Sequence, residues 1–164
     1  MILMKNTAQL LAENKAWIDA TYEKMEKKLR SMAVRSRDVV AYGVDENGLH
    51  RDLTNNISWW TNGFWGGLNA MMYEYTKAEE YLACAKSQEK KLDAALYGDW
   101  KGLHHDVGFQ WHILSGALYR ITGDKDSLTR NFYAANTLAG CHRILDKICF
   151  FHQAKHRNSF LKYE

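Results

Sequence analysis

Residues 73–92, YEYTKAEEYLACAKSQEKKL, decide the fold because their pattern returns 46 residues later, in residues 119–138, YRITGDKDSLTRNFYAANTL. Four positions recur at this spacing: Tyr73, Thr76, Leu82 and Leu92 reappear as Tyr119, Thr122, Leu128 and Leu138. A period of this size, with a helical hairpin as its unit, is typical of stacked αα units that bury their apolar faces on one another. The sequence therefore predicts an all-α fold built from αα-hairpin repeats.

Helical periodicity around this repeat places four helices near residues 63–76, 79–96, 107–121 and 125–139. With one residue inserted, Asn62-Gly63-Phe64 falls opposite Asp106, Gly108 and Phe109. Both glycine-containing loops are therefore expected to open at the same end of the assembly.

A long amphipathic helix is predicted from Thr7 to about Ser36, because apolar residues recur there at steps of seven, four and three. Its apolar face holds Leu11, Ile18, Tyr22, Met25, Leu29 and Met32. Residues 37–62 lose this period and carry a turn signal at Asp45 to Gly48, with alternating apolar residues at its edges. A connection of this length without a helix is usually a functional loop or a misassigned element.

Composition restricts the class of protein. A chain of 164 residues predicts one domain. The net charge of +3 forms no basic stripe of the kind that follows a phosphate backbone. Three cysteines without a repeated spacing favour reduced thiols over a secreted disulfide framework. Because no apolar run approaches the length of a membrane span, we expect a soluble cytoplasmic protein that binds neither nucleic acid nor membrane.

Two interpretations compete for Asp106, which directly precedes a predicted helix. Its carboxylate could cap the helix N-terminus, a role worth about 1 kcal/mol. Gly108 favours the other, because a glycine in a first turn is tolerated mainly where something approaches the backbone closely. Exposed N–H groups beside an imidazole would then accept an anion, and the same is expected at Gly63.

A metal site has little support from the sequence. His104, His105, Asp106 and His112 cluster, but adjacent loop residues rarely converge on one ion, and the helices carry no i, i+4 histidine pair. Cys149, His152 and His156 lack a second pair of well-spaced cysteines. We therefore expect no metal and no cofactor.

Aromatic residues gather in and beside the two loops, at Trp59, Trp60, Phe64, Trp65, Trp100 and Trp111. Tryptophan is large, rigid and apolar with one N–H group, which suits it to stack on a sugar ring. Phe64 and Leu68 have i, i+4 spacing, so Phe64 and one tryptophan are expected to pack inward. Trp60 is the expected exposed platform.

Two motifs in order, WWTNGFWGGLNAMMYEYT at 59–76 and LHHDVGFQWHILSGALYRITGD at 103–124, resemble the unsaturated glucuronyl hydrolases, glycoside hydrolase family 88. The likeness covers roughly residues 37–140. It implies part of a cytoplasmic (α/α)6 barrel that works without a metal and releases Δ4,5-unsaturated uronic acid from lyase-generated oligosaccharides. A carboxylic acid protonates the vinyl ether, water adds at C5, and the resulting hemiketal collapses, unlike the usual displacement at the anomeric carbon.

The resemblance also implies roles for individual residues. Asp106 matches the family's active-site aspartate, and His105 matches the neighbouring residue that contacts the sugar. Trp60 matches the tryptophan that stacks on the unsaturated ring, and Asn62 is given a polar contact with the substrate.

After Ala139-Gly140 the resemblance stops, so we expect residues 1–140 to be the N-terminal part of the barrel domain and residues 141–164 to be an atypical tail from a frameshift or premature stop. The family's second aspartate, its general acid and base, would then be absent, and turnover would be weak or lost. A helix in the tail is expected to present Ile144, Leu145, Ile148, Phe150 and Phe151. Exposed apolar edges would favour a homo-oligomer. The alternative is a non-catalytic αα-repeat module that binds carbohydrate or a protein partner.

Overall fold

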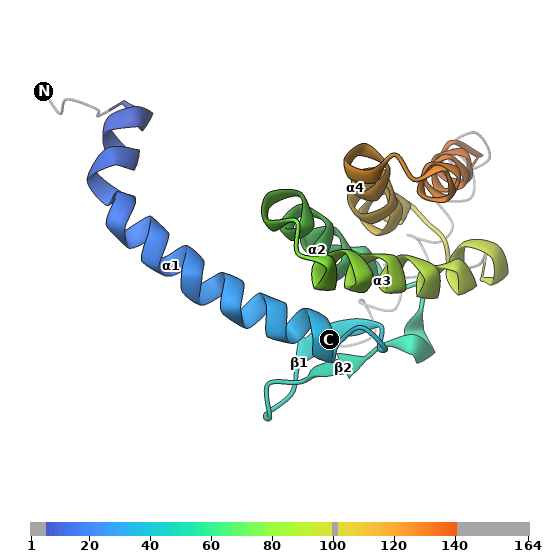
Figure 1. Ribbon diagram of the computed structural model, residues 1–164. Coiled ribbons are helices and arrows are strands. Elements are labelled where there is room, and N and C mark those ends of the chain that lie inside the picture. The colour runs from blue at the N-terminus through green and yellow to red at the C-terminus, as the bar shows by residue number, and fades with distance from the viewer. Residues whose placement is uncertain (1–5, 100–101, 141–164) are drawn as a thin grey trace, which may run out of the picture.

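The computed structural model describes residues 6–99 and 102–140, and this part of the chain is all-α apart from one small sheet (Figure 1). Its helices are α1 (Thr7–Arg35), α2 (Asn62–Thr76), α3 (Glu79–Gly98), α4 (Ile113–Thr122) and a last helix over 125–140. A π-helical segment, η2 (Gly108–His112), leads directly into α4. The predicted fold class is confirmed, and the arrangement is compatible with part of a helical barrel.

The repeat is confirmed at the corners of the two hairpins, α2–α3 and α4–helix 125–140. α2 ends in a left-handed residue, Lys77 (φ 57°), whose N–H donates to Tyr73 O at 2.8 Å. α4 ends in the same way at Gly123 (φ 74°), whose N–H donates to Tyr119 O at 2.8 Å. A threonine before each cap donates its hydroxyl to the preceding turn at 2.7 Å, from Thr76 to Met72 and from Thr122 to Leu118. The same left-handed cap therefore closes both repeats.

The core forms where the two hairpins stack, around the fully buried side chain of Trp111. α2 can approach η2 and α4 closely because three glycines face them. A Cβ on Gly66 would lie 2.7 Å from Leu114 Cδ1, and one on Gly67 would lie 2.5 Å from Ile113 Cγ2. Glycines in WWTNGFWGG thus set the distance between the hairpins.

Residues 37–62 contain a short hairpin, β1 (Ala41–Val44) with β2 (His50–Asp52), followed by the turn η1 (Thr54–Asn56). The predicted turn signal is confirmed, because Asp45 Oδ1 accepts the N–H groups of Asn47 and Leu49, both at 2.9 Å. Gly48 supplies the positive φ of 71° that this turn needs. The long connection is therefore a structured element that leads the chain to the start of α2.

α1 begins in a capping box, in which Asn6 Oδ1 accepts the N–H of Gln9 and Gln9 Oε1 accepts that of Asn6. Its second half packs on α3, where the hydroxyl of Tyr81 donates to Glu26 O at 3.0 Å. Residues 7–20 are exposed along their whole length, and Figure 1 shows this half extending away from the other helices. The predicted apolar face is thus only partly covered by the described residues, and a homo-oligomer stays a prediction.

Within residues 6–99 and 102–140, every helix is too short or too polar to cross a lipid bilayer. Cys84 is a buried free thiol in this range. Trp100, Cys141, Cys149, His152, His156 and the expected tail helix lie outside the described residues.

Candidate functional site

Two buried amides hold the backbone that precedes Trp60. Asn62 Nδ2 donates to the carbonyls of Asn56 and Ile57, at 3.0 and 2.8 Å. Gln110 Nε2 donates to the next two carbonyls, of Ser58 and Trp59, at 2.7 and 2.9 Å. Four consecutive carbonyls are therefore satisfied from two different hairpins. Because both amides are almost fully buried, they fix the turn against the core.

Three aromatic side chains, Trp60, Phe64 and Phe109, form an exposed cluster above this turn. The Trp60 ring meets Phe64 and Phe109 edge to face at 5.8 and 5.9 Å, and the two phenylalanines stack at 5.9 Å. Trp60 is 39% exposed, as predicted for a platform. The prediction that Phe64 points inward is wrong, since it is 41% exposed, whereas Trp111 is the tryptophan that packs inside.

The glycines at the two helix starts have different surroundings from those predicted. A Cβ on Gly63 would overlap the backbone of Gln110 and lie 2.5 Å from Phe109 O, so the start of α2 is covered by protein. The expected anion seat at Gly63 is therefore wrong. Gly108 has no neighbour within 4 Å of an added Cβ, so open space remains beside it.

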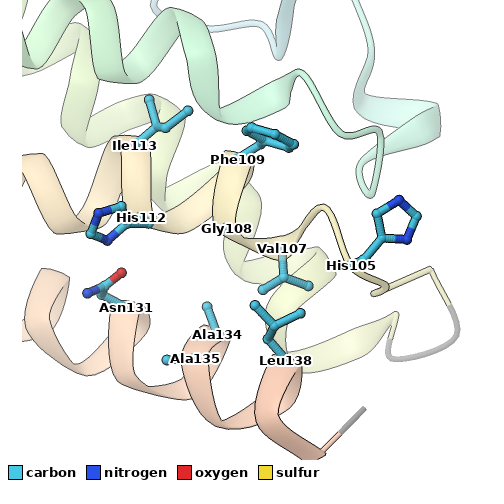
Figure 2. Close-up of a pocket in the computed structure, with 10 residues that line it drawn as sticks. All are labelled: His105, Val107, Gly108, Phe109, His112, Ile113, Asn131, Ala134, Ala135 and Leu138. Carbon is cyan, nitrogen blue, oxygen red and sulfur yellow. The ribbon is translucent and has the colours of Figure 1, made fainter. Parts of the chain in front are cut away.

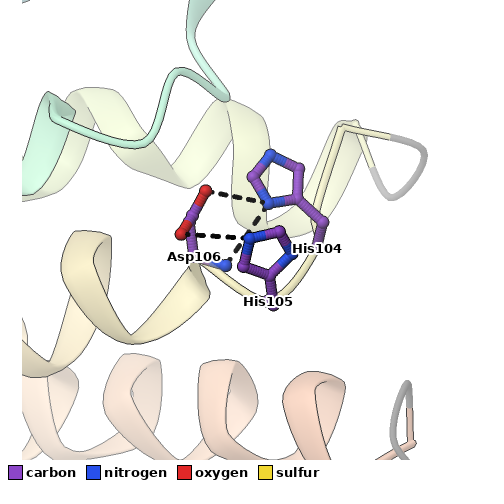
Figure 3. A group of neighbouring side chains, drawn as sticks. All are labelled: His104, His105 and Asp106. Carbon is purple, nitrogen blue, oxygen red and sulfur yellow. Dashed lines mark hydrogen bonds and ion pairs between the residues drawn. The ribbon is translucent and has the colours of Figure 1, made fainter. Parts of the chain in front are cut away.

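The carboxylate of Asp106 faces two imidazoles, as Figure 3 shows. His104 Nδ1 lies 3.3 Å from Oδ2, and His105 Nε2 lies 3.5 Å from Oδ1. The capping interpretation is wrong, because no side chain caps η2 by a hydrogen bond. Asp106 contributes to the helix start only through its carbonyl, which accepts the N–H of Phe109 at 2.8 Å. With a side chain 19% exposed, it is sheltered but open to a ligand.

A hollow of about 470 Å³ lies beside His105, between the start of the α4 hairpin and helix 125–140 (Figure 2). Its walls are mostly apolar, with Val107 and Phe109 on one side and Ala134 and Leu138 on the other. The lining also contains His105, His112 and Asn131, but no carboxylate among the described residues.

The structure thus brings three of the four predicted site residues into one region. Asp106 and His105 are in contact, and Phe109, one turn further on, carries the contact to Trp60. Asn62 lies apart, buried beneath the turn, with its Oδ1 unpartnered among the described residues.

Sequence reasoning missed Gln110 and Phe109. A signal for Gln110 was present, because it is a polar residue inside the otherwise apolar GFQWHIL stretch. Phe109 was aligned with Phe64 by the repeat, and the two rings stack on each other.

One cluster has donor atoms that suit a metal ion. Nitrogen and carboxylate oxygen atoms of His104, His105 and Asp106 all lie within 4.8 Å of one another. The reason given against a metal, that adjacent loop residues rarely converge, does not hold for this turn. His112, which was grouped with them in the sequence, is not in this cluster.

Comparison with known proteins identifies two similar hydrolases. The chain is 29% identical over 96 residues to an unsaturated glucuronyl hydrolase of Bacillus sp. (strain GL1), covering 56% of this chain and 24% of that protein. It is 30% identical over 92 residues to an unsaturated chondroitin disaccharide hydrolase of Streptococcus agalactiae serotype III (strain NEM316), covering 56% and 23%. The chain spans about a quarter of the length of these curated relatives. No family model and no solved structure matches the chain. Over part of its length, this chain therefore resembles the unsaturated glucuronyl hydrolases.

Proposed function

We propose that this chain is a glycoside hydrolase-like protein that acts on saccharides ending in a Δ4,5-unsaturated uronic acid. The observation that carries the proposal is the sheltered Asp106 carboxylate, one turn from an exposed aromatic cluster, in a chain similar to two hydrolases named for unsaturated substrates. An acid and a flat apolar platform are what a sugar ring with a reactive double bond requires.

Each site residue has a distinct task in this proposal. Trp60 stacks on the unsaturated ring, with Phe64 and Phe109 holding its edge. Asp106 delivers a proton to C4 of the vinyl ether, and water then forms the new bond at C5. The hemiketal opens and releases the remaining saccharide. His105, which is largely exposed, donates a hydrogen bond to the sugar.

Asn62 is the site residue whose expected task changes most. Its amide nitrogen is already used by two backbone carbonyls. We therefore propose that it acts on the substrate through Trp60, as a positioning residue, in place of a direct contact.

A second candidate is a non-catalytic module that binds carbohydrate or a protein partner. It is favoured by the hollow beside His105, whose described lining is apolar and contains no second carboxylate. Such a module would bind the same saccharide without converting it.

The decisive measurement follows the ultraviolet absorbance of an unsaturated uronic-acid disaccharide, because hydration of the double bond removes this absorbance. We expect turnover, reduced at least about 100-fold in Asp106→Asn, since a general acid typically contributes that much. Asp38→Asn is the matched control, because the Asp38 side chain is 87% exposed. Calorimetric binding of the disaccharide without loss of absorbance would replace the hydrolase with the binding module. An active Asp106→Asn variant would remove Asp106 from the chemistry.

A further inference from the structure

We propose that His104, His105 and Asp106 form a binding site for a divalent transition-metal ion of the Zn²⁺ class. The proposal does not depend on the proposed function, since metal binding is measured without a saccharide. It concerns the side chains drawn in Figure 3, which present two imidazoles and one carboxylate from a single turn.

The spacing of the donor atoms is that of a coordination sphere. A tetrahedral ion with ligands at about 2.0–2.1 Å holds neighbouring donor atoms about 3.3–3.4 Å apart. The two measured separations from the Asp106 oxygens are 3.3 Å, to His104 Nδ1, and 3.5 Å, to His105 Nε2. The two imidazole rings lie 5.1 Å apart at 44°, so both can turn their nitrogens to one point. Because the His105 side chain is 69% exposed, this adjustment meets little resistance.

Hydrogen bonding also indicates a cation between these groups. His104 Nδ1 accepts the backbone N–H of Asp106 at 3.3 Å. A nitrogen that accepts this bond carries no proton, and an ionised carboxylate can only accept. Nδ1 and Oδ2 therefore face each other as two acceptors at 3.3 Å, which is unfavourable unless a positive charge lies between them. A proton or a metal ion can supply that charge.

The donor set selects the kind of ion. Imidazole nitrogen suits Zn²⁺, Cu²⁺ and Ni²⁺, whereas Mg²⁺ and Ca²⁺ prefer oxygen ligands. Three protein ligands leave one tetrahedral position for water, as in zinc sites that are open to small molecules. An ion held here would occupy the carboxylate of Asp106, and would thus compete with any proton transfer by that residue.

Calorimetry with Zn²⁺ and the full chain tests the site. We expect one ion per chain, with affinity reduced at least about tenfold in each of His104→Gln, His105→Gln and Asp106→Asn, because loss of even an outer-shell partner typically costs 10–100-fold. His112→Gln is the matched control, being an exposed histidine of η2 outside the cluster. Circular dichroism of each variant checks that the fold is kept.

Substitution of Co²⁺ distinguishes this site from the cysteines and histidines of residues 141–164. We expect visible bands of a nitrogen and oxygen site without a thiolate charge-transfer band, and these bands should persist in a Cys149→Ser, His152→Gln, His156→Gln variant. Loss of binding in that triple variant, or an equal loss in His112→Gln, would overturn the proposal. So would the absence of Zn²⁺ binding by a folded wild-type chain.

Discussion

Asn62 and Gln110 lie on different hairpins, yet their side chains donate to four consecutive backbone carbonyls, those of residues 56–59. Neither amide can be reached from solvent to any extent, since both are at most 2% exposed. Trp60 follows directly after the last of these carbonyls. The position of an exposed site residue is therefore set by two residues that no ligand touches.

Replacement of Asn62 by leucine should lower the free energy of unfolding by about 1–3 kcal/mol, because two buried carbonyls lose their donor. Chemical denaturation gives this quantity. Asn55→Leu is the matched control, because Asn55 is exposed in the same loop. Equal costs for the two substitutions would show that the clamp contributes nothing beyond a general effect of removing asparagine.

The two glycines at the helix starts should respond in opposite ways to alanine. Gly63→Ala should destabilise the protein by several kcal/mol, because the new methyl group meets the backbone of Gln110, which cannot move aside cheaply. Gly108→Ala should be neutral or stabilise by up to about 1 kcal/mol, because its Cβ meets nothing and alanine favours a helix. Thermal unfolding of both variants gives the comparison, and a Gly63→Ala protein as stable as wild type would contradict the close approach.

Helices and hairpin corners were predictable from the sequence because they depend on local pattern. The predicted helix 63–76 is observed as Asn62–Thr76, and 79–96 as Glu79–Gly98. The first turn of the fourth predicted helix differs, because residues 108–112 form a π-helical segment that no periodicity indicated.

The site was predictable only in part, because it depends on how the hairpins approach each other. Gly63 allows α2 to lie against Gln110, and this contact turns Phe64 outward onto Phe109. An i, i+4 spacing cannot reveal which face a neighbouring hairpin leaves open. The convergence of His104 and His105 on Asp106 likewise depends on the conformation of one turn, which composition does not specify.

The contact between α3 and helix 125–140 should depend on Arg130. This guanidinium donates to both oxygens of Asp93, at 2.6 and 2.9 Å, and contacts Glu89 at 3.4 Å. Arg130→Met should cost about 2–4 kcal/mol, because it leaves carboxylates sheltered without their partner. Lys86→Met, which removes the more exposed pair with Asp124, should cost at most about 1 kcal/mol. Denaturant unfolding at neutral pH measures both, and similar values would contradict the role of burial.

Glu89 should give stability a distinctive pH dependence. Burial raises the pKa of its carboxyl above the usual 4.5, although Ser127 and Arg130 partly oppose this shift. A group with a raised pKa stabilises the fold below its unfolded pKa, and this contribution is lost as the pH rises through the folded pKa. Glu89→Gln should therefore gain stability relative to wild type as the pH rises above 4.5, up to the folded pKa.

Unfolding free energies across this pH range test that prediction. Glu74→Gln, which removes an exposed carboxylate of α2, is the matched control. A wild-type curve that runs parallel to that of Glu89→Gln would show that the two states bind protons equally at this position.

Trp60 and Trp59 offer a paired test of the platform, because both are 39% exposed but only Trp60 makes ring contacts with Phe64 and Phe109. Those contacts hold the Trp60 ring in one orientation, so little freedom is lost when a sugar stacks on it. Trp60→Ala should weaken binding of an unsaturated uronic-acid disaccharide roughly tenfold, or about 1.4 kcal/mol, whereas Trp59→Ala should change it little. Calorimetry measures both affinities. A larger loss in Trp59→Ala would move the platform to that residue, and the aromatic cluster would then serve packing alone.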